Sequence, residues 1–153
     1  METLKLEAKK RNETGKNQVK KVFKEGLVPG IIYGGDKEPV KVSVNPIAIE
    51  RIVRSSTGQN TLIKIEKIEE KKDSVENVII YKIDKDPITF QLKHIDFLRV
   101  FDNKPVTVTV PIKLDGDAPG LKFGGVLIQK IKELKVESLP GNIPEAIIAN
   151  LSK

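Results

Sequence analysis

Apolar and polar residues alternate along several short stretches of this chain, and this period of two constrains the fold more than any other feature. In the clearest stretch every second residue is a branched apolar one: Val106, Val108, Val110 and Ile112. Successive side chains of a β-strand point to opposite faces of its sheet, so the pattern is typical of a strand with one buried face. The segment is therefore predicted to be a half-buried strand.

Further segments show the same pattern, some of them more loosely: residues 4–7, 40–44, 62–68, 78–83, 90–100 and 134–137. Residues 28–35 contain a run that resembles a fully buried strand. Proline and glycine separate these segments, for example at Pro29-Gly30, Gly34-Gly35 and Pro140-Gly141. So many short strands predict a mainly β fold with only short helices.

One short helix is predicted after the strand at residues 40–44. Asn45 has an N-capping side chain, and Pro46 suits the first position of a helix because its fixed backbone angle is already helical. Ile49, Ile52 and Val53 follow at helical spacing, so one face of this helix is expected to be buried.

A second helix is predicted over residues 16–25, and it ends before Gly26. Its apolar residues fall on one arc: Val19, Val22 and Phe23. Its lysines fall on the opposite arc: Lys16, Lys20, Lys21 and Lys24. The apolar arc is expected to dock on a sheet while the lysines face outward. Like charges one helical turn apart disfavour an isolated helix, so an anionic partner would stabilise this segment.

The first 24 residues carry most of the excess positive charge of the chain. They contain eight basic and three acidic side chains, a net charge of +5, whereas residues 25–99 sum to zero and residues 100–153 to +1. Before the predicted helix, three basic residues are consecutive: Lys9, Lys10 and Arg11. A local patch of one sign attracts a polyanion to one place. The alternative, a lysine-rich end that is only solvated, stays open.

The composition excludes several classes of site and of protein. The chain has no cysteine and one histidine, so disulfides, thiolate metal sites and multi-histidine metal centres are impossible. No apolar stretch approaches the roughly 18 residues of a membrane span, and the N-terminus lacks the apolar core of a signal peptide. We expect a cytoplasmic protein that is monomeric when free, with no metal, cofactor, membrane or small-molecule partner.

A change in composition near Val100 indicates a domain boundary. Residues 101–105 contain turn-forming residues, and the charge density falls after them. We predict an α+β or barrel-like domain over residues 1–100 and a smaller β-rich domain over residues 101–153. The glycine-rich segment 116–125 lacks the Gly-Lys-Ser/Thr sequence of a phosphate-binding loop, so it is predicted to be a hairpin or a connecting loop.

His94 and Asp96 stand two residues apart in a predicted strand, so both side chains point to the same face. Three interpretations stay open: a base and its orienting acid in a hydrolase, a polar pair that fixes local strand contacts, or a face that reads base edges and 2′-hydroxyls of RNA. Catalysis is disfavoured because no suitable nucleophile is found. Tyr33, at the end of a predicted buried strand, is either a core residue or one that stacks on a base or reaches a phosphate.

Several short motifs follow one another in order: Arg11 to Lys16 (RNETGK), Val28 to Gly34 (VPGIIYG) and His94 to Arg99 (HIDFLR). In this order and spacing they resemble the "L twenty-five" family of bacterial large-subunit ribosomal proteins. Further motifs are similar to its longer, two-domain branch, the general stress protein Ctc: Val110-Pro111, Gly116, Gly120, Gly124-Gly125 and residues 139–145. The similarity spans almost the whole chain.

The resemblance implies a small β-barrel that binds 5S rRNA in the central protuberance of the large subunit, and a protein that is not an enzyme. It implies RNA contacts at seven positions: Arg11, Lys16, Lys20, Lys21, Tyr33, His94 and Asp96. With the lysines Lys9, Lys10 and Lys24 these residues form the candidate RNA-binding site. Two alternatives to a constant ribosomal protein are a stress-related RNA-binding factor and a hydrolase that uses His94 and Asp96.

The chain departs from the family pattern at three places. Lys20 and Lys21 stand where the family has arginines, and a lysine has the charge of arginine but not its planar fork of donors. Residues 17–19 are larger than the small residues usual after Gly-Lys. The C-terminal domain stops at Lys153, sooner than in the two-domain branch, so it is either naturally short or incomplete.

Overall fold

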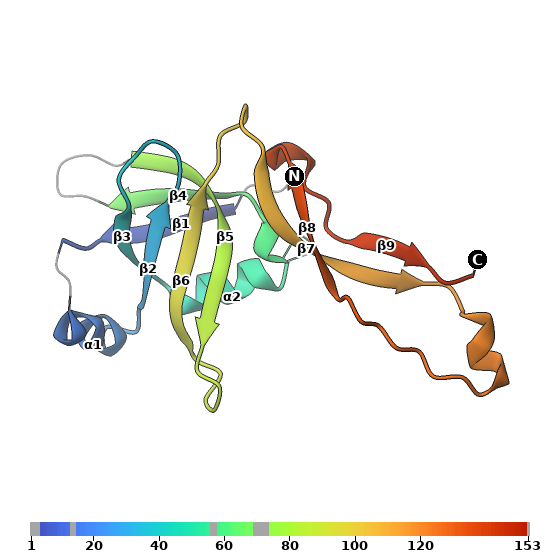
Figure 1. The fold of residues 1–153 in the computed structure, drawn as a ribbon. Coiled ribbons are helices and arrows are strands. Elements are labelled where there is room, and N and C mark those ends of the chain that lie inside the picture. The colour runs from blue at the N-terminus through green and yellow to red at the C-terminus, as the bar shows by residue number, and fades with distance from the viewer. Residues whose placement is uncertain (1–3, 13–14, 56–57, 69–73, 153) are drawn as a thin grey trace.

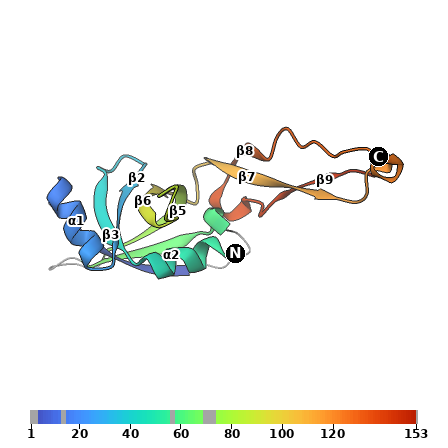
Figure 2. The same ribbon diagram turned by 90° about the horizontal axis from the view of Figure 1, so that it is seen from below.

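A closed barrel of six strands is followed by an arm formed by a three-stranded sheet (Figure 1). Viewed from below, the arm extends away from one side of the barrel and carries the C-terminal end of the chain (Figure 2). The computed structural model describes residues 4–12, 15–55, 58–68 and 74–152. The prediction of a mainly β fold with short helices is therefore confirmed.

The barrel consists of strands β1 (Leu4–Lys10), β2 (Val28–Tyr33), β3 (Val40–Val44), β4 (Ile63–Ile68), β5 (Ser74–Lys85) and β6 (Leu92–Arg99). Around the barrel their order is β1-β3-β2-β6-β5-β4. Two of the pairings are parallel, β1 with β4 and β2 with β6, and the other four are antiparallel. The pairing of β1 with β4 closes the barrel.

The alternation that predicts the strands also fills the barrel. Alternate residues of the strands point inward except where β5 is bulged, and the core contains mostly isoleucine and valine with the fully buried Phe97. Helix α2 (Pro46–Val53) adds Ile49 and Ile52 to this core. Asn45 caps α2, because its side-chain oxygen accepts a 2.9 Å hydrogen bond from the backbone N–H of Ile47. The predicted capped helix is thus observed.

Gly30 marks a close approach between the parallel strands β2 and β6. A Cβ atom at this position would lie 2.9 Å from the carbonyl oxygen of Ile95 and 3.2 Å from the ring of Phe97. The backbone would have to shift, so we expect Gly30→Ala to destabilise the protein by about 1–3 kcal/mol in urea unfolding. Gly141→Ala is the matched control, since a Cβ there meets nothing within 4 Å. Equal effects of the two substitutions would contradict this explanation.

Helix α1 (Lys16–Lys24) packs on the outside of the barrel, next to β2 (Figure 1). Val22 is buried and Val19 is half-buried, as the apolar arc predicts. Phe23 is 42% exposed, so the prediction that it docks with them is wrong in this respect. The helix has only nine residues, and Phe23 lies in its last turn.

Strand β6 begins later than its sequence suggests. The pattern predicts a strand from residue 90, but Phe90 has a φ of 57° and is largely exposed in the turn between β5 and β6. Asp86 shapes this turn, because its carboxylate accepts hydrogen bonds from the backbone N–H groups of Ile88 and Thr89. Because the apolar Phe90 continues the alternating run, the sequence pattern placed the start of this strand two residues too early.

The arm contains β7 (Val106–Asp115), β8 (Glu133–Ser138) and β9 (Ile147–Asn150), in the order β8-β7-β9. The glycine-rich segment 116–125 forms the first part of the connection between β7 and β8 and contains a 3₁₀ turn at Pro119–Phe123, as expected of a connecting segment. A second apolar cluster joins the arm to the barrel: Ile79, Val100, Val108, Val110 and Ile143. Among the described residues, no helix has the length and apolarity needed to cross a bilayer.

Candidate nucleic-acid interface

The basic residues before α1 and one lysine of α1, Lys21, line a common groove. The groove has a volume of about 520 Å³ and lies between the end of β1 and α1. Its basic lining residues are Lys9, Lys10, Arg11 and Lys21. Glu25 is the acidic residue among those that line it. Residues that are only loosely clustered in the sequence thus form one concave, mainly positive surface.

Arg11 is held in place at this groove by the barrel itself. Its Nε donates a 3.1 Å hydrogen bond to the carbonyl oxygen of Val42, and its backbone N–H donates to the carbonyl oxygen of Lys41. Partial burial lowers the pKa of Arg11, but arginine stays charged in proteins. The guanidinium is therefore a pre-positioned cation with further N–H groups that can bind a phosphate.

The lysine arc of α1 faces solvent, as its sequence predicts. Its four members are exposed: Lys16, Lys20, Lys21 and Lys24. Within the described part of the chain, no acidic side chain forms an ion pair with any of them. The first turn of α1 has no acidic residue either, and Gly15 at the N-cap has no side chain to cap it. The helix therefore keeps its full positive charge for a partner. Glu13 and Thr14 of the RNETGK motif lie outside the described residues.

A polar face on β2, β6 and β5 forms the second part of the candidate site. The Nδ1 atom of His94 lies 2.8 Å from Oδ1 of Asp96, and both side chains are partly exposed. Asp96 lies beside Ile31 of β2 and Lys82 of β5 in the strand register, and His94 lies beside Asp84. We call the outward-facing residues Tyr33, Tyr81, Lys82, His94 and Asp96 the strand face. The predicted placement of His94 and Asp96 on one side is observed.

Tyr33 lies at the end of the strand face opposite His94, and it forms an edge-to-face pair with Tyr81. The ring centroids are 6.2 Å apart and the ring planes are inclined by 81°. Burial, then the charge of Asp96 and the neighbouring Tyr81, raises the pKa of Tyr33. Tyr33 is half-buried, whereas Tyr81 is 53% exposed. The two rings form an aromatic corner, open to solvent, on which a base can stack.

Sequence patterning missed Tyr81 as a member of this face. The register of β5 against β6 shifts between Ile80 and Lys82, so a β-bulge at Tyr81 breaks the strict alternation. A period-two count from the inward-facing Val78 and Ile80 places Tyr81 outward, as observed, but it wrongly turns Lys82 inward. The sequence signals for Tyr81 are therefore this alternation and its large, partly polar aromatic side chain.

The two parts of the candidate site lie on neighbouring elements. A short turn leads from α1 into β2, and β6 runs parallel beside β2. The start of β6, which carries His94, therefore lies at the α1 end of the barrel (Figure 1). The lysine arc and the start of β6 thus lie toward the same end of the barrel, while Tyr33 and Tyr81 are at the opposite end of the strand face.

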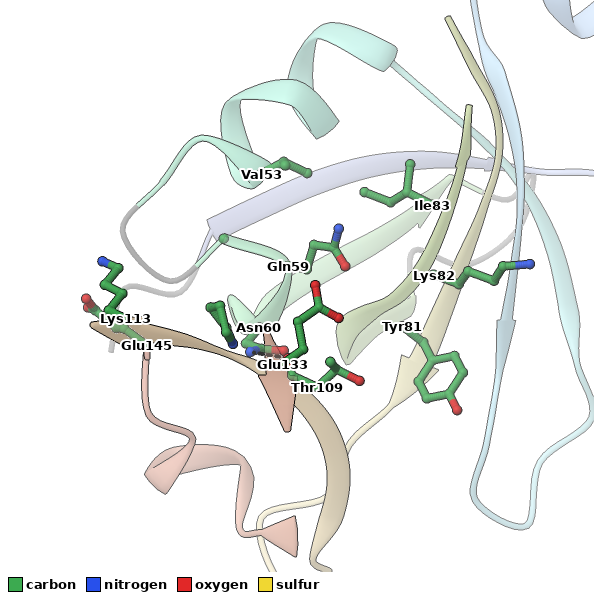
Figure 3. Close-up of a pocket in the computed structure, with 12 residues that line it drawn as sticks. Val53, Gln59, Asn60, Tyr81, Lys82, Ile83, Thr109, Lys113, Glu133 and Glu145 are labelled. Atoms are coloured by element: carbon green, nitrogen blue, oxygen red, sulfur yellow. Dashed lines mark hydrogen bonds between the residues drawn. The ribbon is translucent and has the colours of Figure 1, made fainter. Parts of the chain in front are cut away.

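A cavity of about 550 Å³ lies between the barrel and the arm and is bordered by Tyr81 and Lys82 of the strand face (Figure 3). Gln59 of the barrel and Glu133 of the arm point into its middle (Figure 3). Its charged lining residues have both signs: Lys82, Lys113, Glu133 and Glu145. Mixed charge gives no net attraction for a polyanion, so this cavity does not extend the basic surface. Within the described ranges, no three potential ligands cluster as a metal site.

Comparison with known proteins identifies the family of the chain. Residues 6–97 match the model of the Ribosomal L25p family, and residues 105–153 match the model of the Ribosomal protein TL5, C-terminal domain. Relatives named "Large ribosomal subunit protein bL25" include one from Halothermothrix orenii, 32% identical over 152 residues, which covers 99% of this chain and 68% of the relative. One from Listeria monocytogenes is 40% identical over 147 residues, covering 96% and 69%.

A third relative of the same name, from Moorella thermoacetica, is 32% identical over 152 residues, covering 99% of this chain and 73% of the relative. The chain thus spans about two thirds of the length of these proteins. The names describe a structural component of the ribosome, not an enzyme. The chain therefore belongs to the L25p family of large-subunit ribosomal proteins, with a C-terminal region of the TL5 type.

Proposed function

We propose that this protein binds 5S rRNA in the large ribosomal subunit, in the cytoplasm, through the groove, the lysine arc and the strand face. The observation that carries the proposal is the groove lined by Lys9, Lys10, Arg11 and Lys21, together with the paired His94 and Asp96 of the strand face. RNA binding needs both parts, because phosphate contacts supply affinity and position while polar and aromatic groups read shape and unpaired bases. In this proposal residues 1–100 hold the RNA and residues 101–153 form a separate β-rich domain.

The division of labour follows from the chemistry of each part. The lysines and Arg11 neutralise phosphates and release counterions. Asp96 fixes the orientation of the His94 ring through Nδ1, which leaves Nε2 available to a base edge or a 2′-hydroxyl. The aromatic corner of Tyr33 and Tyr81 offers a stacking surface. The protein acts by positioning RNA and not by chemical catalysis.

Equilibrium binding to 5S rRNA and to an unrelated structured RNA of equal length tests the proposal. The full chain is expected to bind 5S rRNA more tightly at physiological salt. Equal affinity for both RNAs would instead indicate an unspecific, stress-type RNA-binding factor. The proposed function is wrong if neither RNA binds.

The strand face makes a separate prediction about specificity. His94→Ala and Asp96→Ala each remove hydrogen bonds without removing a lysine, so each should weaken binding to 5S rRNA by about 1–3 kcal/mol. Binding to the unrelated RNA should hardly change, and for Asp96→Ala it should rise slightly because a negative charge is lost. Lys93→Ala is a control on the same strand, since its side chain pairs with Asp86 in the turn. Equal weakening toward both RNAs would show that the His94–Asp96 pair only stabilises the strand.

A further inference from the structure

A charged cluster is buried at the end of the barrel away from α1. Lys67 and Arg99 are 6% and 5% exposed, and they share the carboxylate of Glu76. Arg99 Nε lies 2.8 Å from Glu76 Oε2, and Lys67 Nζ lies 3.1 Å from Glu76 Oε1. These residues do not belong to the strand face, and RNA binding as proposed above gives them no role.

Arg99 also reaches the loop that directly follows Tyr33. Its Nη1 donates to the carbonyl oxygens of Gly34 at 3.3 Å and Lys37 at 3.4 Å. The loop turns through Gly34 and Gly35, whose φ angles are 102° and 68°. A Cβ atom on Gly35 would lie 2.6 Å from the ring of Phe101, so the loop also packs tightly on its other side. One guanidinium thus connects the buried Glu76 to the backbone next to Tyr33.

The same arginine borders the aromatic corner. Arg99 and Tyr81 both line a cavity of about 390 Å³, together with Gly35 and Leu98. Leu98 is the strand partner of Tyr33 in the parallel register of β2 and β6. The loop directly follows Tyr33 and borders the cavity that Tyr81 also lines. A shift of the loop would therefore move Tyr33 and change the surroundings of Tyr81.

We propose that Arg99 is a positioning residue for RNA binding, because it clamps the loop after Tyr33 to Glu76 and so holds the Tyr33–Tyr81 corner in its RNA-ready arrangement. This inference rests on the proposed RNA-binding function of the strand face. Only arginine suits the position, since its planar fork can bond a carboxylate with one nitrogen and two carbonyl groups with another. A lysine keeps the buried charge but has one nitrogen, which cannot serve both partners.

The tyrosine content of the chain makes the effect on Tyr33 directly measurable. The protein has two tyrosines and no tryptophan, so in a Tyr81→Phe background the intrinsic fluorescence and the phenol titration report Tyr33 alone. In that background Arg99→Lys should increase acrylamide quenching of Tyr33 and lower its pKa toward the ordinary value of a solvated phenol. With Tyr81 present, Arg99→Lys should weaken 5S rRNA binding roughly tenfold, the size expected for the loss of one charge-assisted bond.

Lys37→Ala is the matched control. It removes the exposed ammonium 3.7 Å from Glu76 but leaves the backbone carbonyl that Arg99 holds, so Tyr33 should be unchanged. A second test avoids the buried charges: one glycine inserted between Gly35 and Asp36 should displace the Lys37 carbonyl and expose Tyr33 in the same way.

The outcomes separate this inference from the proposed function. A folded Arg99→Lys protein with unchanged quenching and pKa of Tyr33 overturns the positioning role, and so does an insertion that leaves both unchanged if Arg99→Lys does not fold. A changed Tyr33 signal without any change in 5S rRNA affinity also overturns it. If the unsubstituted protein does not bind 5S rRNA, the proposed function fails while the fluorescence still reports whether Arg99 holds the loop.

Discussion

Replacing Glu76 by glutamine is expected to lower the free energy of unfolding by about 3–5 kcal/mol, the usual cost of removing one partner from a buried ionic group. Glu76 is the carboxylate between two almost fully buried cations, Lys67 and Arg99. Glutamine keeps the shape of the side chain but removes the negative charge, so the two cations would face each other in the barrel. Urea unfolding followed by circular dichroism measures the loss.

Glu66→Gln on the neighbouring strand is the control. Its ion pair with Lys5 is solvent-exposed at 3.6 Å, and exposed pairs contribute only about 0–1 kcal/mol. A Glu76→Gln protein as stable as Glu66→Gln would contradict the view that the buried charges stabilise the barrel through Glu76.

The same cluster predicts how stability depends on pH. Burial alone would raise the pKa of Glu76, but the hydrogen bonds from Arg99 and Lys67 and their positive charge outweigh it and lower the pKa. A carboxylate with a lowered pKa contributes stability above its unfolded-state pKa and loses it as the pH falls through the folded-state value. Stability should therefore fall below about pH 4.5 more steeply in the natural protein than in Glu76→Gln.

The second large effect is expected for the lysine arc. Changing Lys20 and Lys21 together to glutamine should weaken RNA binding roughly 25- to 60-fold at 0.1 M salt, if each lysine makes one phosphate contact. Because phosphates are common to all RNAs, 5S rRNA and unrelated RNA should be affected alike. Both side chains are exposed, so the free energy of unfolding should stay within about 0.5 kcal/mol.

Lys122 and Lys130 of the arm form the matched control for this pair. They are equally exposed, but they lie far along the chain from α1, in the connection between β7 and β8. Their double change to glutamine removes the same charge and should leave RNA affinity nearly unchanged. Equal losses in both double variants would mean that net charge, and not the lysine arc, determines binding.

Local sequence patterns predicted the strands well because each strand of the barrel has one buried face. Val40–Val44 and Val106–Ile112 are read directly from their alternation, and Asn45-Pro46 marks the start of α2. The closure of the barrel, in contrast, could not be predicted from local patterns. It depends on the parallel pairs β1–β4 and β2–β6, which join segments far apart in the sequence, and no local pattern encodes them.

The alternation of the strands predicts the buried charges better than a count of charged residues does. Lys67 follows Ile63 and Ile65 at period two, Glu76 precedes Val78, and Arg99 follows Phe97. Each charged residue thus occupies an inward-facing position of its strand. Three charges on buried faces of neighbouring strands are a signal for a buried ionic cluster, whereas composition alone treats them as surface residues.

The residues of the candidate site that stand out by type or by sequence spacing could be predicted. The residues whose role depends on three-dimensional contacts could not. The N-terminal lysines and Arg11 stand out by charge, and the His94–Asp96 spacing alone places both on one face. Tyr81 was missed because its pairing with Tyr33 joins strands far apart in the sequence, and Arg99 because its contacts with Gly34 and Lys37 are equally long-range.

The salt dependence of 5S rRNA affinity tests the central claim most directly. The logarithm of the binding constant is measured against the logarithm of salt concentration for the natural protein and for the Lys20→Gln/Lys21→Gln double variant. If the lysine arc binds phosphates, the slope should become shallower by about 0.7–0.9 for each lost contact. An unchanged slope together with unchanged affinity would contradict the account, because the lysines of α1 would then be only a solvated face of the helix.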